Sequence, residues 1–393
     1  MKDRLTPAAC LPRDHAAGTL VGRAWVPGAP AGPSVVAIRA EGVFDLSRVA
    51  PTMSELLDGD DSVAAVKGAR GATWLGDLAA VLANSSADAR DPRTPHFLAP
   101  CDLQAVKASG VTFASSLLER VIEEQARGDA SRAEAIRRTI VSTIGANLAE
   151  VRPGSETAMR LKSLLIEQGA WSQYLEVGIG PDAEIFTKCQ PLAAVGIGAE
   201  IGIHPASTWN NPEPEIVLAV NARGVCVGAS LGNDVNLRDV EGRSALLLGK
   251  AKDNNASCSI GPFIRLFDES FTIDHVRKAE IALTVEGPEG FTLAGASSMS
   301  RISRDPLDLV KHTIHASHQY PDGFMLFLGT MFAPTKDRDQ PGGGFTHKTG
   351  DIVTIAAPEL GALVNRVDRC DRIAPWSFGA GALMKNLAAR GLL

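Results

Sequence analysis

The sequence predicts an α+β protein of two domains, and two observations support this. The chain has 393 residues, more than one compact core usually contains. Short β-branched runs, separated by Gly, Pro, Asn and Asp, occupy residues 18–95 and most of the chain after Tyr174, whereas charged residues at helical spacing fill the stretch between them. We therefore expect strands at both ends of the chain and helices in the middle.

The first domain is predicted to span residues 1–100. Short apolar runs such as GTLVGRAWV and PSVVAIRAEGVFDL alternate with Gly-Pro breaks, and the Pro-rich segment DPRTPHFLAP follows them. This pattern is typical of a small β-containing domain with tight turns. Residues 101–393 are predicted to form the second, larger domain.

A helical segment is predicted over residues 113–170. Its first part places apolar residues at helical spacing among many charges, and GDAS around Asp129 could end one helix and begin another. PGSETAMRLKSLLIEQG predicts a further helix with Ser155 as its N-cap. Beyond it, runs such as EPEIVLAVN, KAEIALTVEG and GFMLFLGTMFA predict strands, with one helix at DPLDLVKHTIHASHQ.

Composition and charge argue against several classes of protein. A net charge of −6, with no dense basic run, disfavours a nucleic-acid partner. No stretch approaches ~20 uninterrupted apolar residues, and the charged, Pro-containing N-terminus lacks the apolar run of a signal peptide, so we expect no membrane partner and no secretion. The six cysteines are scattered without a CxxC pair, which favours a reducing compartment. Together these features predict a cytoplasmic protein.

Two glutamates at a strand start are the first part of a candidate metal site. In NNPEPEIVLAV, Glu213 and Glu215 stand at i and i+2, so both carboxylates project from one face of a strand. Like charges side by side repel each other, and a divalent cation between them would remove the repulsion. A solvated strand edge explains this pair equally well when it is taken alone.

Asp234 supplies a third carboxylate. It ends a strand-like run in the pair Asn233–Asp234, and lies 19 residues beyond Glu215, a spacing that fits a strand-turn-strand return to the same edge. A helix N-cap is the alternative role for this aspartate. Three oxygen ligands with open positions suit Mg²⁺ or Mn²⁺. Lys250 could return to this site as a base or a carbonyl-binding donor if the pocket lowers its pKa, although most lysines lie on the surface.

The order of the motifs resembles the fumarylacetoacetate hydrolase family over roughly residues 101–393. The resemblance rests on E-x-E, then N-D-x-x-x-R-D, then G-K-x-x-D, and then L-G-T at 328–330. It implies a mixed β-roll or sandwich-like catalytic domain, Mg²⁺ or Mn²⁺ on the three carboxylates, and a homodimer or homotetramer. It also implies a catalytic lysine at Lys250 and substrate-binding roles for Lys188, Asn233, Arg238 and Thr330.

Longer stretches resemble a narrower group within this family. WSQYLEVGIGPDAEIFTK, GNDVNLRDVEGRSALLL and HQYPDGFMLFLGTMFAP are similar to bacterial 2-keto-3-deoxy-D-pentonate dehydratases, which also carry an N-terminal domain. This resemblance implies a small sugar-acid substrate of the xylonate or arabinonate type. The metal would bind its carboxylate and ketone, a C3 proton would leave, and loss of the C4 hydroxyl would lead to 2,5-dioxopentanoate.

One position departs from the family's pattern. Family hydrolases place a water-activating histidine, often with a glutamate three residues on, near the start of the catalytic domain, where FASSLLER here has Ser116 and Glu119. No histidine occurs from 97 to 203. This disfavours the alternative function, an acylpyruvase-type hydrolase of a 2,4-diketo acid, and also leaves a sugar-acid binding protein as a third hypothesis.

Ser116 and Glu119 are the remaining catalytic candidates. They stand in the helical segment 113–170, which could close over the site as a lid that excludes water. Either could position a proton for the leaving hydroxide. The competing interpretation of Glu119 is a solvated residue on the outer face of an amphipathic helix.

Overall fold

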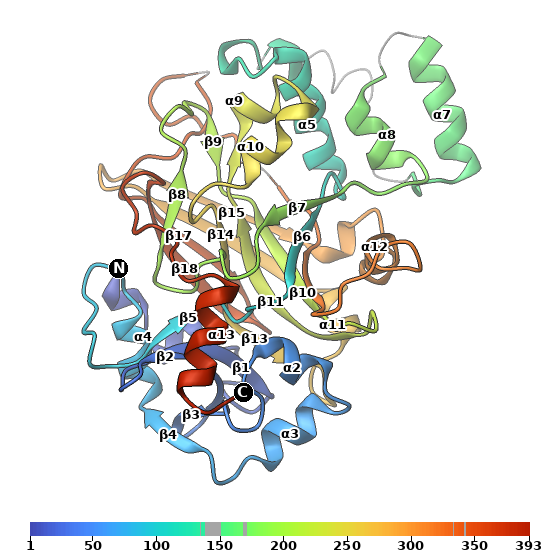
Figure 1. Cartoon of the computed structure of the whole chain (residues 1–393). Coiled ribbons are helices and arrows are strands. Elements are labelled where there is room, and N and C mark those ends of the chain that lie inside the picture. The colour runs from blue at the N-terminus through green and yellow to red at the C-terminus, as the bar shows by residue number, and fades with distance from the viewer. Residues whose placement is uncertain (134, 138–150, 168–170, 333, 342) are drawn as a thin grey trace.

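The computed structural model describes residues 1–133, 135–137, 151–167, 171–332, 334–341 and 343–393, and the side chains of residues 114–116 are also outside this description. The strands lie before the helical segment and after it, as the pattern of the sequence predicts (Figure 1). The mixed α+β class is therefore confirmed. No helix in the described part of the chain combines the length and the apolar content that a membrane span needs.

The first hundred residues form five strands with short helices between them. β1 is the central strand of this part, because β2, β5 and a later strand, β13, all pair with it antiparallel. The elements are η1 (Lys2–Arg4), α1 (Pro7–Cys10), β1 (Leu20–Val26), β2 (Gly32–Arg39), β3 (Gly42–Asp45), α2 (Met53–Asp58), α3 (Ser62–Gly68), β4 (Thr73–Gly76), α4 (Leu78–Asn84) and β5 (His96–Leu98).

One large sheet runs through both predicted domains. Its order is β4-β3-β2-β1-β13-β11-β10-β16-β6-β7, with β5 beside β1. The junction is the β1–β13 pair, in which Leu20 lies opposite Arg265 and Val21 opposite Ile264. The domain division at residue 100 stays a prediction. The later strands of this sheet are β6 (Ala105–Ser109), β7 (Ile185–Cys189), β10 (Pro214–Val220), β11 (Cys226–Asp234), β13 (Cys258–Leu266) and β16 (Phe324–Phe327).

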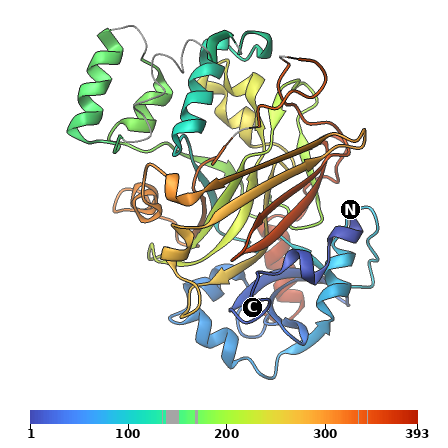
Figure 2. The same cartoon turned by 180° about the vertical axis from the view of Figure 1, so that it is seen from behind.

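A second sheet of five strands crosses the large sheet, as Figure 2 shows from behind. β14 alternates buried and more exposed residues, which is the pattern of a strand with one face on a core. Its buried residues Ile281, Leu283 and Val285 share one core with Ile216 and Leu218 of β10. The strands, in spatial order, are β15 (Thr292–Ser298), β14 (Glu280–Glu286), β17 (Ile352–Ala357), β18 (Gly361–Arg369) and β8 (Glu200–Ile203).

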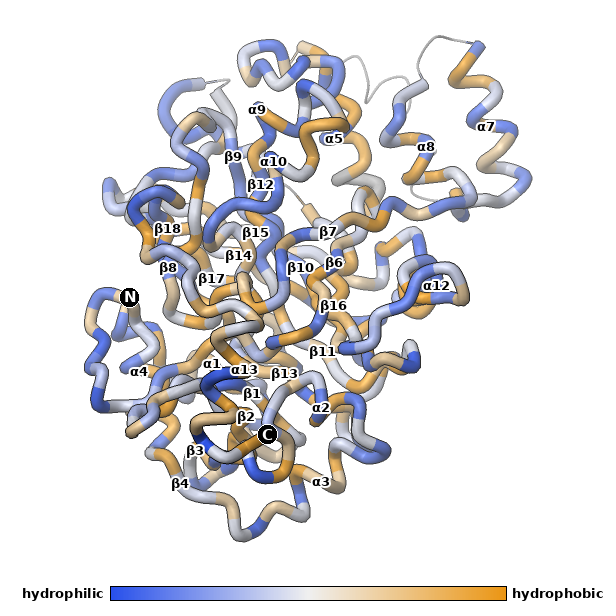
Figure 3. The backbone as a smooth tube through the Cα atoms, viewed as in Figure 1, coloured by the Kyte–Doolittle hydropathy of each residue, from blue (hydrophilic) through white to orange (hydrophobic). Residues whose placement is uncertain are grey.

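The helical segment sits at one end of the sheets. α5 (Ala114–Ala126), α7 (Glu156–Glu167) and α8 (Gln173–Ile179) share a small core of their own. Figure 3 shows hydrophobic and hydrophilic residues alternating along α7, as expected for a helix with one buried face. The predicted N-cap is confirmed, because Ser155 Oγ accepts a hydrogen bond from the amide of Ala158 at 3.2 Å. The lid role of the helical segment 113–170 stays a prediction. Residues 138–150 of this segment lie outside the described part.

The predicted helix break before Asp129 is also present. α5 ends at Ala126, and Arg127 and Gly128 both have positive φ, the left-handed conformation that ends many helices. The remaining elements are β9 (Asn210–Asn211), β12 (Asn236–Leu237), α9 (Arg238–Glu241), η3 (Ala245–Leu247), α10 (Leu248–Lys252), α11 (Ile273–Val276), η4 (Met299–Arg301), α12 (Pro306–Thr313) and α13 (Ala380–Ala389).

Candidate metal centre

The three predicted carboxylates meet at the end of one strand pair. Glu213 and Glu215 flank the first residue of β10, and Asp234 is the last residue of β11, which pairs with β10 antiparallel. Each of the three residues is 1% exposed, and one oxygen from each lies within 4.8 Å of the others. Asp234 is therefore a strand end and not a helix N-cap, and the predicted return to the same edge is confirmed.

Asn233 holds the backbone of this edge. Its Oδ1 accepts a hydrogen bond from the amide of Glu213 at 3.0 Å, and the amide of Asp234 donates to the carbonyl oxygen of Glu213 at 3.1 Å. Two strand ends are thus fixed against each other beside the carboxylates. The substrate-binding role predicted for Asn233 stays a prediction, since the contacts of its Oδ1 are structural.

Two buried lysines contact the carboxylates. One precedes all three carboxylates in the sequence, and the other follows them. Lys252 Nζ lies 2.6 Å from Glu213 Oε2 and 3.0 Å from Asp234 Oδ2. Lys188 Nζ lies 2.9 Å from Asp234 Oδ1 and also donates to the carbonyl oxygen of Val235 at 3.1 Å. Burial of such charges is costly unless they are paired, and here each is paired with a carboxylate.

The predicted position of the lysine in the G-K-x-x-D motif is wrong. The structure brings Lys252 to the carboxylates, whereas the side chain of Lys250 is exposed. Both lie on α10, where residues two apart point about 200° away from each other. One lysine therefore faces the metal centre and the other faces solvent.

A β-bulge explains how Lys188 enters the centre. Val106 of β6 lies opposite Cys189 of β7, but the next residue, Lys107, lies opposite Thr187. Lys188 is the extra residue between them. Bulges redirect a side chain at the edge of many active sites, and here the redirected side chain is fully buried against Asp234.

Glu215 is the carboxylate that most needs a cation. Its oxygens accept hydrogen bonds from the amide of Gly329 at 2.7 Å and from Thr330 Oγ1 at 3.1 Å, but no ion pair reaches it from the described residues. Burial raises its pKa well above the ordinary value, and the charges of Asp234 and Glu213 raise it further. A hard divalent cation accepts oxygen ligands and offsets this repulsion, so the donor set fits Mg²⁺ or Mn²⁺.

The pKa of Glu213 shifts in the opposite direction. Burial alone would raise its pKa, but the charges of Arg120 and Lys252 and a hydrogen bond from Lys252 outweigh burial and lower the pKa to about 2. It is therefore ionised over the whole physiological range. The centre thus combines one firmly ionised carboxylate with one that ionises only beside added positive charge.

Comparisons with known proteins agree with this geometry. Residues 177–368 match the family model described as "Fumarylacetoacetate (FAA) hydrolase C-terminal". This matched segment, just under half of the chain, is similar to the C-terminal domain of that family. It contains all three carboxylates and both buried lysines, whereas α5 lies outside it.

Two curated relatives and one solved structure are similar to the chain. A "Probable 2-keto-3-deoxyxylonate dehydratase" of Haloferax volcanii is 31% identical over 49% of this chain, and a "2-dehydro-3-deoxy-D-arabinonate dehydratase" of Saccharolobus solfataricus is 28% identical over 48%. The matches span 63% and 60% of those proteins' own lengths. A structure of a 2-keto-3-deoxy-D-arabinonate dehydratase complexed with magnesium and 2,5-dioxopentanoate superposes with a TM-score of 0.61, at 20% identity over 89% of this chain and 99% of that one, which shows a shared fold.

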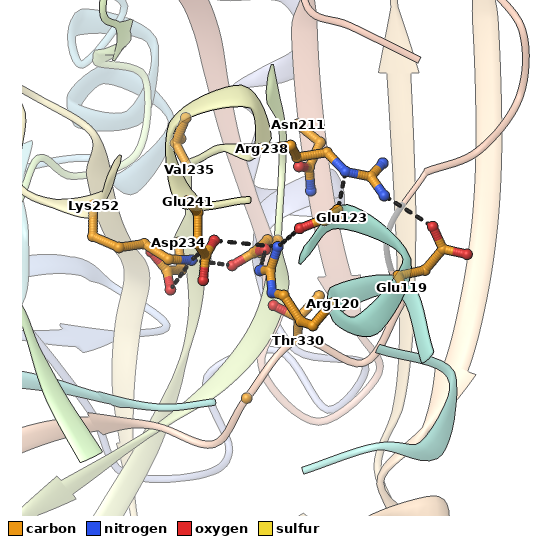
Figure 4. Close-up of polar contacts among 12 residues, drawn as sticks. Glu119, Arg120, Glu123, Asn211, Asp234, Val235, Arg238, Glu241, Lys252 and Thr330 are labelled. Carbon is orange, nitrogen blue, oxygen red and sulfur yellow. Dashed lines mark hydrogen bonds and ion pairs between the residues drawn. The ribbon is translucent and has the colours of Figure 1, made fainter. Parts of the chain in front are cut away.

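A chain of alternating charges joins the segment that matches the family model to α5 (Figure 4). Arg120 of α5 pairs with Glu213, and its Nη1 lies 2.6 Å from Glu123 and 3.2 Å from Glu241. Arg238 continues the chain, because its Nε donates to Glu123 Oε1 at 2.6 Å. Arg120 ends the FASSLLER stretch, but the sequence assigns no role to it or to Glu123 beyond it, so only the docking of α5 reveals their contacts.

Glu119 lies at the outer end of this chain. It accepts hydrogen bonds from Arg137 at 2.8 and 3.0 Å and from Arg238 Nη2 at 2.9 Å. Burial would raise its pKa, but these arginines together lower it, so Glu119 is ionised and is a poor proton donor at neutral pH. The side chain of Ser116 lies outside the described residues. A catalytic role for either residue stays a prediction.

Arg238 makes two further contacts that hold the fold together. Its guanidinium lies over the Trp209 ring at 4.6 Å, and its Nη1 donates to the carbonyl oxygen of Pro334 at 3.2 Å. It also lines a cavity of about 500 Å³ together with Arg137 and Lys336. The substrate-binding role predicted for Arg238 stays a prediction, and none of the three carboxylates is among the residues that line this cavity.

Glu184 is a further titratable residue at the centre that sequence reasoning missed. Burial raises its pKa to about 7; the charges of Glu241 and Glu213 add to the rise, while Arg120 and Lys252 oppose it. Its carboxylate makes no hydrogen bond or ion pair within the described residues. A lone glutamate before an apolar strand has no recognisable pattern, so nothing in the sequence marked it.

Glu184 lies against Gly110. A Cβ atom added to Gly110 would lie 1.7 Å from Glu184 Oε2, so a side chain at this position would displace the carboxylate. The groups that shift its pKa all belong to the metal centre or its charge chain. A carboxyl group that is half ionised near neutral pH can both accept and donate a proton.

Proposed function

We propose that the protein is a divalent-metal-dependent dehydratase that converts a 2-keto-3-deoxy-D-pentonate to 2,5-dioxopentanoate. The observation that carries this proposal is the cluster of three buried carboxylates with Lys252 beside it. Glu184, whose pKa the charges of this cluster shift, is the candidate base. The similarity to dehydratases of 2-keto-3-deoxy sugar acids supports the substrate class. Bound at Glu213, Glu215 and Asp234, Mg²⁺ or Mn²⁺ would supply Lewis-acid stabilisation of the negative charge that develops on the C2 oxygen.

The protein's own residues account for the proton movements. Glu184 in its ionised form accepts the C3 proton, and the same proton, now on its carboxyl group, goes to the departing C4 hydroxyl, which leaves as water. The electron pair of the C3–H bond becomes the C3–C4 double bond, and tautomerisation toward C5 gives the aldehyde. Lys252 keeps positive charge beside the carboxylates throughout, and the reaction is redox-neutral.

The proposal is tested by incubating the protein, freed of metal with a chelator, with Mg²⁺ or Mn²⁺ and 2-keto-3-deoxy-D-xylonate or 2-keto-3-deoxy-D-arabinonate. We expect aldehyde formation that depends on added metal. Pyruvate release from a 2,4-diketo acid under the same conditions would instead support the acylpyruvase-type hydrolase. Tight binding of the sugar acid without any product would support a binding protein.

We predict that Glu184→Gln removes the acidic limb of the pH profile. Since the wild-type residue must be ionised and its pKa is about 7, kcat/KM should rise about tenfold per pH unit below pH 7 and level off above it. Glu184→Gln should lower kcat by about 10²- to 10⁴-fold and leave a flat remainder. Asp182→Asn, at an exposed neighbouring position, is the matched control.

Glu184→Gln should not destabilise the folded protein at high pH. A carboxyl group whose pKa is higher in the folded than in the unfolded chain opposes folding once it ionises, so this stability penalty grows as pH rises from about 4.5 to 7. Glu184→Gln should therefore be at least as stable as the wild type at pH 8 in thermal unfolding. An unstable Glu184→Gln protein with an unchanged pH profile would contradict the assignment.

A further inference from the structure

A second cavity, of about 210 Å³, shares no lining residue with the metal centre. It forms where three parts of the chain meet: the first hundred residues, the segment after β7, and the segment that leads into α13. Figure 1 shows α13 lying across the strands of the first part. We call this cavity the tail pocket; its walls are mainly apolar and include Trp25, Phe97, Leu192, Val195, Trp376 and Phe378.

The C-terminal segment is firmly docked where it closes the tail pocket. The rings of Trp25 and Phe378 meet edge to face with centroids 5.5 Å apart. Beyond them, Asn386 Nδ2 donates to the carbonyl oxygen of Ala31 at 2.7 Å, and Arg390 Nη2 donates to Ser34 Oγ at 2.6 Å. Phe378 and Trp25 are therefore already in place for a ligand, whereas Trp376 is 47% exposed.

One buried cation lines this apolar space. Arg23 is 5% exposed; its Nη1 donates to the carbonyl oxygens of Ala99 at 3.4 Å and Cys101 at 2.6 Å, and its Nε lies 3.4 Å from Asp102 Oδ2. The remaining nitrogen, Nη2, makes no hydrogen bond within the described residues. This nitrogen is not among the fully buried polar atoms that lack a partner, so it is open to accessible space, and a carboxylate inside the pocket could accept its hydrogen bond.

The charge of Arg23 is only partly compensated. Asp102 accepts hydrogen bonds from the backbone amides of Met53 at 2.6 Å, Ser54 at 3.0 Å and Leu103 at 2.8 Å, so its carboxylate is shared among several donors. Arg90 adds a second cation at the rim, and no Asp or Glu is among the described residues that line the pocket. The space therefore combines aromatic walls with positive charge that is only partly compensated.

We propose that the tail pocket binds a small carboxylate with an aromatic or branched aliphatic body. The carboxylate accepts from Arg23 Nη2 and from Arg90, in the charge-assisted geometry that guanidinium groups favour. The body fills the space between Trp25, Phe97 and Trp376. Such a ligand joins the three parts of the chain and stabilises the folded protein by mass action. This site is independent of the proposed reaction.

Calorimetric titration of the full chain with benzoate, benzamide and acetate tests the proposal. Benzoate should bind at least about tenfold more tightly than benzamide, which has the same ring without the charge, and acetate should bind too weakly to measure. Arg23→Gln and Arg90→Gln should each reduce the preference for benzoate over benzamide by about tenfold or more. Equal binding of benzoate and benzamide would overturn the proposal.

Two further variants separate the tail pocket from the metal centre and from misfolding. Ala194 lines the pocket, so Ala194→Leu fills it without removing a charge and should abolish benzoate binding while metal binding is kept. Glu215→Gln and chelator treatment should leave benzoate binding unchanged. Binding that persists in Ala194→Leu, or that disappears in Glu215→Gln, would show that benzoate occupies the metal centre instead. If Arg23→Gln does not fold, the comparison of Arg90→Gln and Ala194→Leu decides the question.

Discussion

Glu215→Gln should abolish metal-dependent turnover and still fold. The carbonyl oxygen of glutamine can still accept from the amide of Gly329, and its NH₂ group can donate to the hydroxyl of Thr330, so both neighbours that hold this side chain keep a partner. It removes one of three anionic oxygen ligands, and we expect the affinity for Mn²⁺ to fall by at least about 100-fold and kcat/KM by about 10³-fold, equivalent to ~4 kcal/mol of transition-state stabilisation.

The stability of this variant separates a metal site from a merely structural cluster. Glu215 is buried beside two other carboxylates, which raise its pKa, so replacing it with a neutral amide should leave the unfolding temperature in chelator unchanged or higher. Mg²⁺ at 100 times its Kd should stabilise the wild type by about 2.7 kcal/mol and should not stabilise the variant.

Manganese binding by electron paramagnetic resonance and thermal unfolding with and without Mg²⁺ measure these effects. Glu280→Gln, at an exposed position on β14, is the matched control and should behave as the wild type. Wild-type manganese affinity in Glu215→Gln would contradict the assignment of the three carboxylates as ligands.

The sequence was sufficient for the secondary-structure classes and for the three carboxylates, because both depend on local spacing. An i, i+2 pair at a strand start fixes the face of Glu213 and Glu215 whatever the fold around them. The Asn233–Asp234 pair ends the neighbouring strand, and antiparallel pairing then brings it alongside. Each step needs only the order of residues along one or two strands.

The groups around the carboxylates could not be predicted in this way. Arg120 reaches Glu213 from a helix 93 residues away in sequence, and Glu184 owes its raised pKa to burial among charges from several segments. Such contacts depend on how α5 docks on the sheets, which has no local signature. The continuity of the sheet through β1 and β13 is equally non-local, since its strands are more than 200 residues apart.

The choice between two lysines shows the same limit on a smaller scale. A motif of the form G-K-x-x-D gives the sequence position of one lysine, but the side that faces the centre depends on where α10 begins. The helix begins at Leu248, and its phase turns Ala251 and Lys252 inward. A shift of two residues in helical phase is beyond the precision with which helix boundaries are read from sequence.

Lys252→Met should therefore have a much larger effect than Lys250→Met. The wild-type ammonium lies 2.6 Å from Glu213 and 3.0 Å from Asp234 and is 2% exposed, so its loss leaves two buried carboxylates with less positive charge. Breaking a buried ion pair costs about 3–5 kcal/mol, and we expect the lower part of that range because Lys188 and Arg120 still pair with the same carboxylates. Turnover should fall by about 10²- to 10⁴-fold.

The two variants differ only in which face of α10 loses its charge, so they are matched in composition and in helix propensity. Lys250→Met should keep the wild-type unfolding temperature, metal affinity and turnover, because its side chain is exposed. Mg²⁺ should restore part of the stability lost in Lys252→Met, since a cation at the three carboxylates compensates the same charges, but it should not restore turnover. A loss of turnover in Lys250→Met with full activity in Lys252→Met would mean that α10 rotates when substrate binds, and the side of the helix assigned to the centre would then be wrong.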